Sequence, residues 1–372
     1  MKKQKILINA INLYTGGSQT ISHYIFDEID KLNEYNFTII APKILKNQIS
    51  FNKNHKVIFF EYPKKKFNFV YKLFIDHIYI AKKFKKEKFD LVLNCGNFSS
   101  FFVNNEKQLT LFHNIFYTYN FEQIKKYLNI RLILEIFLFK FCTNRKSFFL
   151  TQNNFVKKKL INKYNLDRRR LFVVDFFKCI PLIFKKNKNF KIANNLKINK
   201  NYKNIIYPAN YYPNKNFDKL YLFDEIISEN KLNIKIFLTI KNIDYLELKK
   251  KYNLKNIYNL GQLKKNKIYN YYKKFDFVLN LSEFESMCLP LYEAIFFSKK
   301  IISVEADFIP LNFKKKIFLI SGFNKKYIKT SLMRVIKSRN EKKIIYNDLS
   351  HDNLFSLNKI FKIRLNEKKY IN

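Results

Sequence analysis

The sequence has little glycine, proline, cysteine and acid. Its 372 residues include 5 Gly, 7 Pro, 4 Cys and no Trp, and 29 acidic residues stand against 71 basic ones. Because glycine and proline are so scarce, we expect each one that remains to hold a backbone position that other residues cannot. The cysteines form no C-x-x-C pair and have no metal-site spacing, so we expect reduced thiols in a cytoplasmic protein.

The net charge of +42 is the first property that suggests a partner. Such a charge is typical of proteins that bind nucleic acid or an anionic membrane. The lysines, however, recur in nearly every segment, and arginine, which recognises bases and phosphates through two parallel hydrogen bonds, is scarce. The pattern therefore indicates a solvated basic surface and predicts no specific nucleic-acid partner.

Long apolar runs are also missing. No run of roughly 18 apolar residues occurs and no secretory signal is visible, so we expect neither a membrane span nor export. The nearest candidate is "IRLILEIFLFKFC" at 130–142, which Glu135 and Lys140 interrupt. It fits a cationic amphipathic helix at a membrane surface or a helix buried against a sheet, and we favour burial.

Short β-rich runs alternate with helical patterns along the chain. "KILINAINL", "NFTIIAP", "FDLVLNC", "QLTLFHN" and "KSFFLTQ" predict strands. After the polar stretch at 185–203 the rhythm restarts with "NIIYPAN", "IKIFLTI", "IYNLGQ", "DFVLNLS" and "KKIISVEA". This alternation indicates parallel sheets covered by helices. We therefore predict an α/β protein with two doubly wound, Rossmann-like domains facing a cleft. The expected domains are 1–185 and 186–350, with a helical tail at 351–372 that can return to the first domain.

Ligands of such sheets bind at the carboxyl ends of strands, and two of these ends carry suggestive residues. "LYTGGSQT" places Gly16 and Gly17 in a strand-to-helix turn, where a backbone can approach a phosphate or sugar, although an ordinary tight turn also explains them. "YPANYYPNKNFDKL" places Lys215 before a helix that we expect to begin near Asn216. Lys215 is thus either a diphosphate clamp or a solvated lysine.

A third strand end is followed by "SEFESMCLPLYEAIFF" at 282–297. Pro290 is suited to the first turn of a helix, so we expect Glu293 in that turn and Glu285 in the loop before it. Free amides at the helix start can receive phosphate, and the two carboxylates can accept hydrogen bonds from ribose and sugar hydroxyls. In the alternative, Glu293 favours the helix dipole and Glu285 is solvated.

"SEFESMCLPLYEA" resembles the S-x-x-E-[SG]-F-G-L-P-L-x-E-A signature of family 4 glycosyltransferases of the GT-B fold, with Glu285 and Glu293 as its Glu-x7-Glu pair. "PNKNF", "ILINAINLYTGGSQT", "LTLFHNIF" and "FFLTQNNFVKKKL" are similar to further segments of that family, in matching order from about residue 5 to 307. Met287 and Cys288 replace the F-G of the signature, and no arginine accompanies Lys215.

The resemblance implies a retaining hexosyltransferase that moves a sugar from a UDP- or GDP-sugar to a lipid-linked or oligosaccharide acceptor in polysaccharide or lipopolysaccharide biosynthesis of the cell envelope. No metal or other cofactor is expected. His113 and Glu285 are the implied catalytic residues. The implied donor-binding residues are Gly16, Gly17, Asn210, Lys215, Leu289 and Glu293.

We also expect peripheral attachment to the anionic inner face of the plasma membrane through lysines of the first domain. The alternative function is that of a catalytically weakened GT-B protein that serves as a binding partner in a polysaccharide assembly complex.

Overall fold

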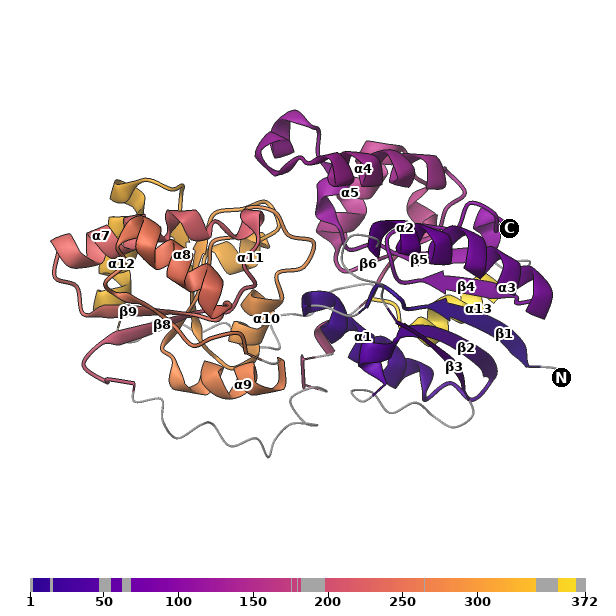
Figure 1. Ribbon diagram of the computed structural model, residues 1–372, viewed down its shortest axis with the longest axis horizontal. Coiled ribbons are helices and arrows are strands. Elements are labelled where there is room, and N and C mark those ends of the chain that lie inside the picture. The colour runs from indigo at the N-terminus through magenta and orange to yellow at the C-terminus, as the bar shows by residue number, and fades with distance from the viewer. Residues whose placement is uncertain are drawn as a thin grey trace. The chain divides into compact units, whose positions relative to one another are not determined.

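The structure is a computed structural model that describes residues 3–13, 16–46, 55–61, 68–174, 176–178, 180–181, 198–263, 265–338 and 354–365. Its contacts divide the chain into two units (Figure 1). The first unit is Met1–Cys179 with His351–Asn372, and the second is Ile180–Ser350. The boundary thus lies at 179/180, where the sequence suggested 185/186, and the C-terminal segment belongs to the first unit.

A parallel sheet forms the centre of the first unit. Among the described residues its strand order is β3-β2-β1-β4-β5-β6-β7. The strands are β1 (Gln4–Asn9), β2 (Tyr35–Pro42), β3 (Lys56–Phe60), β4 (Leu91–Asn94), β5 (Gln108–Leu111), β6 (Phe149–Thr151) and β7 (Leu171–Val173). The sheet is covered on both faces, and consecutive residues of a strand, such as Ile6, Leu7 and Ile8, are therefore all buried.

Helices connect these strands. They are α1 (Gly16–Ile29), α2 (Asn68–Leu73), the π-helical segment η3 (Phe74–Tyr79), α3 (Ile80–Glu87), α4 (Ile130–Cys142), α5 (Asn154–Tyr164) and α13 (Leu357–Leu365). Asparagine caps the starts of two of them. The Asn129 side chain accepts a hydrogen bond from the Leu132 amide at the start of α4, and Asn153 accepts one from Val156 in α5.

The C-terminal segment packs against the first sheet through aromatic side chains. The buried Phe361 ring of α13 lies 5.9 Å from the Tyr35 ring and 6.1 Å from the Phe37 ring, both from β2. The Phe355 amide donates to the Val173 carbonyl at 2.9 Å, which extends the pairing beyond β7. Residues far apart in sequence thus share one core.

The second unit repeats the arrangement, with the strand order β10-β9-β8-β11-β12-β13 among the described residues. Its strands are β8 (Lys203–Tyr207), β9 (Ile234–Leu238), β10 (Ile257–Asn259), β11 (Phe277–Asn280), β12 (Lys300–Val304) and β13 (Phe318–Ile320). Its helices are α7 (Leu220–Glu229), α8 (Asn242–Tyr252), α9 (Lys265–Lys274), α10 (Leu289–Phe296), α11 (Leu311–Lys314) and α12 (Lys325–Lys337).

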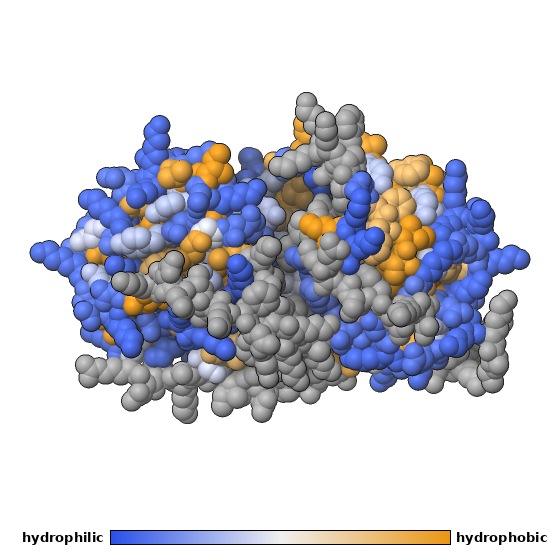
Figure 2. All heavy atoms as spheres, turned by 60° about the horizontal axis from the view of Figure 1, so that its bottom comes forward, coloured by the Kyte–Doolittle hydropathy of each residue, from blue (hydrophilic) through white to orange (hydrophobic). Residues whose placement is uncertain are grey.

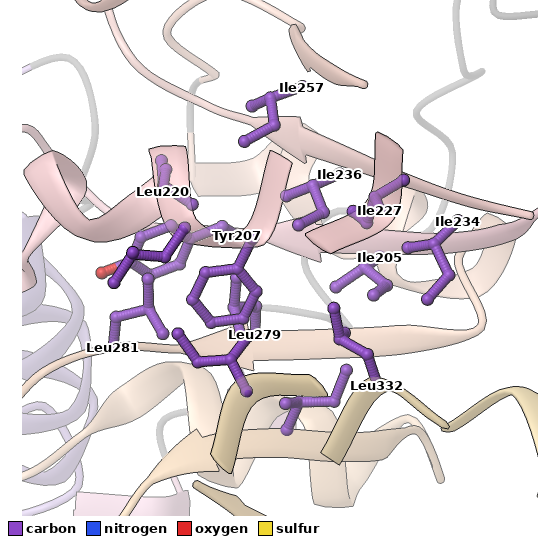
Figure 3. Packing of buried hydrophobic residues seen from close by; sticks show 14 of the residues in the cluster. Ile205, Tyr207, Leu220, Ile227, Ile234, Ile236, Ile257, Leu279, Leu281 and Leu332 are labelled. Carbon is purple, nitrogen blue, oxygen red and sulfur yellow. The ribbon is translucent and has the colours of Figure 1, made fainter. Parts of the chain in front are cut away.

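A buried apolar cluster holds the second sheet to its helices (Figure 3). Ile205, Ile236 and Leu279 come from three neighbouring strands, while Leu220 comes from α7 and Leu332 from α12. These side chains point toward one another in Figure 3. Two parallel α/β sheets of this kind confirm the predicted fold class.

Both sheets have a point at which the strand order reverses. In the first unit it lies between β1 and β4, and in the second between β8 and β11. On the two sides of such a point the connections leave in opposite directions, so the carboxyl ends of the two strands border an open crevice. The loops after β1, β4, β8 and β11 are therefore the places to look for ligand-binding residues.

The surface and the thiols match the compositional expectations. On the face drawn in Figure 2, hydrophilic residues cover much of the coloured surface, with hydrophobic patches between them. Cys95, Cys142 and Cys288 are buried and free, while Cys179 lies outside the described residues. No helix in the described ranges is long and apolar enough to cross a bilayer.

Replacing Phe361 tests the docking of the C-terminal helix. Phe361→Ala should lower the free energy of unfolding by about 3 to 5 kcal/mol, because it leaves a cavity beside β2. Urea denaturation followed by tyrosine fluorescence measures this. The exposed Phe141 is the control, since Phe141→Ala should stay within about 0.5 kcal/mol of the parent. Equal effects of the two changes would contradict the packing described for α13.

Candidate functional site

The loops that follow β8 and β11 are joined side by side because the two strands are neighbours in the sheet. Consecutive residues of the first loop contact the second. The Asn214 side chain donates to the Phe284 carbonyl at 3.1 Å, and the Asn216 side chain donates to the Leu281 carbonyl at 2.8 Å. Between them, the Lys215 ammonium forms an ion pair with the Glu285 carboxylate. Lys215 and Glu285, both predicted site residues, therefore meet at the reversal point of the sheet.

Local backbone geometry explains how Lys215 reaches Glu285. Residues Pro213–Lys215 form a 3-10 turn (η9), and Asn216 follows in the left-handed region with φ of +49°. A second 3-10 turn, η10 (Phe217–Lys219), leads into α7. The helix near Asn216 that the sequence suggested therefore starts as a 3-10 turn, and α7 itself begins only at Leu220. The Tyr207 hydroxyl donates to the Lys215 carbonyl and fixes the turn.

Lys215 and Glu285 neutralise each other in a largely buried place. Their side chains are 14% and 15% exposed. Burial lowers the pKa of Lys215, but the charge of Glu285 and the hydrogen bond to it outweigh burial, and the pKa rises above its ordinary value. The lysine is thus fully charged at neutral pH, and any anion that binds here competes with Glu285 for it.

Glu293 has a different environment. Helix α10 begins at Leu289, so Glu293 lies in its second turn and not, as expected, in the first. The residue is 1% exposed, and its carboxylate accepts hydrogen bonds from the Tyr272 hydroxyl at 2.7 Å and the Tyr269 hydroxyl at 3.4 Å. Burial, with the Glu293 charge second, raises the pKa of Tyr272 well above its ordinary value, so this phenol stays a donor. Glu293 is therefore a buried carboxylate with tyrosine partners from α9.

The start of α10 differs from the expectation of free amides. The Leu289 amide donates to the Met287 carbonyl at 2.9 Å, and the Leu291 amide donates to the Cys288 carbonyl at 3.0 Å. Pro290 between them has no amide hydrogen. Cys288, which replaces the glycine of the signature, has φ of −77°, a conformation open to any residue. The replacement therefore costs no backbone strain, while Lys215 remains the candidate for holding a phosphate.

In the first unit, Asn97 holds His113 after β5. The Asn97 side-chain oxygen accepts hydrogen bonds from the His113 amide at 2.7 Å and the Asn114 amide at 3.0 Å. That oxygen must face the two donors, so the amide nitrogen faces the imidazole, where it lies 3.4 Å from Nε2. A donor at this position makes Nε2 the acceptor, and a neutral His113 then carries its proton on Nδ1.

The surroundings of His113 keep it neutral. Burial, with the Lys72 charge second, lowers the pKa of His113 to about 4. Gly96 precedes Asn97, and a Cβ at Gly96 would overlap the Asn12 side chain from the loop after β1. This glycine therefore allows the loops after β1 and β4 to touch at the reversal point of the first sheet.

The remaining predicted residues lie at the same strand ends. Gly16 and Gly17 are the first residues of α1, and Asn210 is half-buried in the loop after β8. Leu289 is the first residue of α10. The functional candidates that sequence reasoning missed are Asn97, Tyr269 and Tyr272. The spacing of three between the tyrosines placed them on one helix face, but nothing in the sequence connected that face to Glu293.

The sequence and the structure of the chain were compared with those of known proteins. The sequence model of the family described as glycosyl transferases group 1 matches residues 188–348, within the second unit. No curated protein matches the sequence.

Solved structures match both units. WaaG, a glycosyltransferase involved in lipopolysaccharide biosynthesis, is similar with a TM-score of 0.63 at 9% identity over 90% of each chain. A glycosyltransferase from Rickettsia africae ESF-5 is similar with a TM-score of 0.56 at 17% identity over 100% of each chain. Anabaena HepE, in complex with UDP-glucose, has a TM-score of 0.56 at 13% identity over 90% of each chain. The likeness shows the GT-B fold, and together with the family match it supports a glycosyltransferase.

Changing Asn97 to aspartate should raise the pKa of His113. Asn97→Asp keeps the oxygen that accepts from the two amides and tolerates the observed φ of +70°, but it turns the donor toward the imidazole into a charged acceptor. We expect an increase of about 1 to 3 pKa units, read from the imidazole resonances in an NMR titration. Asn324→Asp, which caps α12 in the second unit, is the control. An unchanged titration in Asn97→Asp would refute the contact.

A double-mutant cycle tests the pair of Lys215 and Glu285. Lys215→Met and Glu285→Gln should each lower the free energy of unfolding by about 2 to 4 kcal/mol, because each leaves one partner without its counterpart in a largely buried place. The double variant should lose clearly less than the sum, with a coupling of about 1 to 3 kcal/mol in urea denaturation. Additive losses would show that the two groups do not interact.

Proposed function

We propose that this chain is a retaining, metal-independent glycosyltransferase of the family 4 type, which transfers a sugar from a nucleotide-sugar to a cell-envelope acceptor. The observation that carries the proposal is the pairing of Lys215 with Glu285 at the reversal point of the second sheet. Ligands of open α/β sheets bind at such points. The same unit carries the match to glycosyl transferases group 1.

Donor binding exchanges the partners of this pair. A diphosphate brings two or more negative charges and competes for the Lys215 ammonium, which leaves Glu285 to accept hydrogen bonds from hydroxyls of the donor sugar. As the bond from the sugar to the diphosphate breaks, negative charge grows on the leaving phosphate, and Lys215 stabilises it electrostatically. A fixed cation at the leaving group thus supplies what a metal ion supplies elsewhere.

Glu293 is proposed to bind the ribose by exchanging one partner. The hydrogen bond from Tyr269 is the longer of its two tyrosine contacts, at 3.4 Å. A ribose hydroxyl that displaces it would keep the carboxylate fully hydrogen-bonded, because Tyr272 remains at 2.7 Å. Glu293 then has both a structural and a ligand-binding role.

The first unit is proposed to bind the acceptor and to contribute His113. A neutral imidazole in a fixed tautomer can hydrogen-bond a sugar without adding positive charge. Similarity to a lipopolysaccharide glycosyltransferase supports a cell-envelope acceptor, and similarity to a UDP-glucose complex supports a UDP-sugar as donor, with a GDP-sugar as the second choice. We place the enzyme in the cytoplasm, attached peripherally to anionic membranes.

The lysine provides a direct test of donor binding. Lys215→Ala should weaken binding of UDP or GDP by about 1.5 to 3 kcal/mol, the range for a charged hydrogen bond, and should leave binding of the bare nucleoside nearly unchanged. Calorimetric titration measures both. Lys219→Ala, on the following turn and paired with Asp218, is the matched control. Equal losses for nucleoside and nucleoside diphosphate would exclude Lys215 from the diphosphate site.

Glutamine variants separate the two carboxylates. Glu285→Gln removes the competitor of the diphosphate, so it should bind UDP or GDP at least as tightly as the parent and yet turn over the intact donor more slowly. Glu293→Gln should weaken binding of both the nucleoside diphosphate and the intact nucleotide-sugar. It should also lower the free energy of unfolding, since the tyrosine partners of Glu293 are buried. Donor turnover is measured as release of UDP or GDP across a panel of nucleotide-sugars. A parent protein that binds the diphosphate without any turnover would instead favour the weakened binding partner.

A further inference from the structure

Helix α4 is apolar on the side that faces outward. Its inward side carries Leu132, Phe139 and Cys142, which are buried. The Phe139 ring packs 5.3 Å from Phe112 of the first unit and 5.0 Å from Tyr164 of α5. The burial against a sheet that the sequence favoured is therefore satisfied on one side only. Figure 1 shows α4 at the margin of the first unit.

The outward side forms a continuous apolar row, which we name the α4 stripe. Its members are Ile130, Leu134, Phe137 and Phe141, whose spacing places them on one helix face. Ile130 is 80% exposed, Leu134 and Phe137 are 48% exposed, and Phe141 is 78% exposed. The exposed Phe121 lies edge-on to Phe137 at 6.3 Å and widens the stripe. Large exposed apolar patches mark sites of interaction.

The acidic residue of this helix points the other way. Glu135 is buried, where it accepts a hydrogen bond from the Tyr117 hydroxyl at 2.9 Å and from Arg131 Nε at 3.0 Å. A surface helix normally turns its charged residues outward and its apolar residues inward. In α4 the carboxylate is buried while two phenylalanines are exposed. Contact with water alone therefore does not account for the apolar residues on the outward face of the helix.

Basic residues surround the stripe. Residues 120–147 contain six basic and two acidic side chains, and Glu135 is the buried one. The basic residues are Lys125, Lys126, Arg131, Lys140, Arg145 and Lys146. All of them are exposed. A lysine or arginine can lay its alkyl stem along an apolar surface while its charge stays in water.

A second row of exposed apolar residues belongs to α2 and η3 of the same unit. Val70, Phe74 and Ile78 follow one another at intervals of four along α2 and η3, and each is exposed. The Arg131 guanidinium lies over the Phe69 ring at 5.5 Å, which joins the start of α4 to the start of α2. The first unit therefore carries a second exposed apolar row, on helices whose start contacts the start of α4.

We infer that the α4 stripe inserts into the headgroup region of an anionic lipid bilayer. The inference rests on the proposed membrane attachment and names the surface that makes it. Apolar area and surrounding cationic charge are the two signals that interfacial helices combine. A second copy of the chain fits poorly, because a symmetric contact would bring two identical basic rims together. Aromatic side chains then lie among the headgroups and the lysines reach the lipid phosphates.

The lack of tryptophan allows a direct test of insertion. Phe137→Trp introduces the only tryptophan of the chain. With vesicles of phosphatidylglycerol and phosphatidylcholine, its emission should shift to the blue and be quenched by brominated acyl chains. Leu246→Trp is the control, since Leu246 is 62% exposed on α8 of the second unit. It should show neither effect.

Each outcome decides the inference. Quenching at Phe137→Trp alone supports it. Cosedimentation of the protein with anionic vesicles without quenching would mean electrostatic adsorption only and would overturn it. A blue shift that grows with protein concentration in the absence of lipid would identify a contact between copies and would overturn it as well.

A second pair of variants separates the apolar from the ionic contribution. Phe137→Ser with Phe141→Ser should lower the fraction bound to anionic vesicles at 0.15 M salt, with a partition coefficient reduced roughly tenfold or more by the lost apolar area. Ile243→Ser with Leu246→Ser removes two comparably exposed apolar residues from α8 and should change it less than twofold. An equal loss in both pairs would overturn the inference.

Binding of UDP or GDP, measured without lipid, should be unchanged in both pairs. If the parent binds neither nucleotide while Phe137→Trp is quenched, the proposed function fails and the membrane surface stands.

Discussion

The pairing of β8 with β11 is the constraint on which the candidate site depends. These strands are distant in sequence, and connections leave them in opposite directions along the sheet. Their adjacency brings the loop that carries Lys215 against the loop that carries Glu285, and two asparagine side chains then fasten the loops through backbone carbonyls. The first unit uses the same principle at β1 and β4, where Gly96 and Asn12 touch. In both units the polar residues gather at the carboxyl ends of the strands, at the point where the strand order reverses.

Charge sets the second constraint. In a chain with 71 basic and 29 acidic residues, most basic side chains have no acidic counterpart of their own, so a carboxylate held against a lysine with little solvent exposure is a specific arrangement. Removing either partner leaves an uncompensated charge, whereas in the proposed exchange a diphosphate would replace one anion by another. The pair is therefore neutral as it stands, and the proposed binding of a diphosphate would exchange the anion beside Lys215. Glu293 is likewise partnered, but by neutral donors. Two tyrosine hydroxyls donate hydrogen bonds to its carboxylate without cancelling its charge.

Much of this organisation is readable from sequence, and the exceptions have physical causes. Apolar runs bounded by polar turns located most strands, but β3, β7 and β13 were not foreseen, and β7 and β13 have only three residues each. The signature pointed to Glu285 and Glu293, and the separate segment after β8 pointed to Lys215, yet the contacts of Lys215 with Glu285 and of Glu293 with two tyrosines are tertiary and no local pattern encodes them. In the sequence, Tyr269 and Tyr272 could not be told from other residues of α9. The two 3-10 turns around Lys215, which precede α7, were also not predicted. For α4 the composition indicated burial, whereas only the three-dimensional structure shows which face is covered.

Asparagine explains how a chain with so little glycine builds these loops. Left-handed backbone positions usually select glycine, and asparagine is the next most tolerant residue. Here Asn97, Asn165, Asn216 and Asn253 all have φ between +49° and +70°. Asn165 and Asn253 end α5 and α8, where glycine would serve equally well. Asn97 and Asn216 do more, because their side chains hold His113 in place and fasten the Lys215 turn to the end of β11. At these two positions glycine would keep the turn but lose the hydrogen bonds that build the site. Asparagine, which this glycine-poor chain uses at left-handed positions, is therefore also the residue that the candidate site requires.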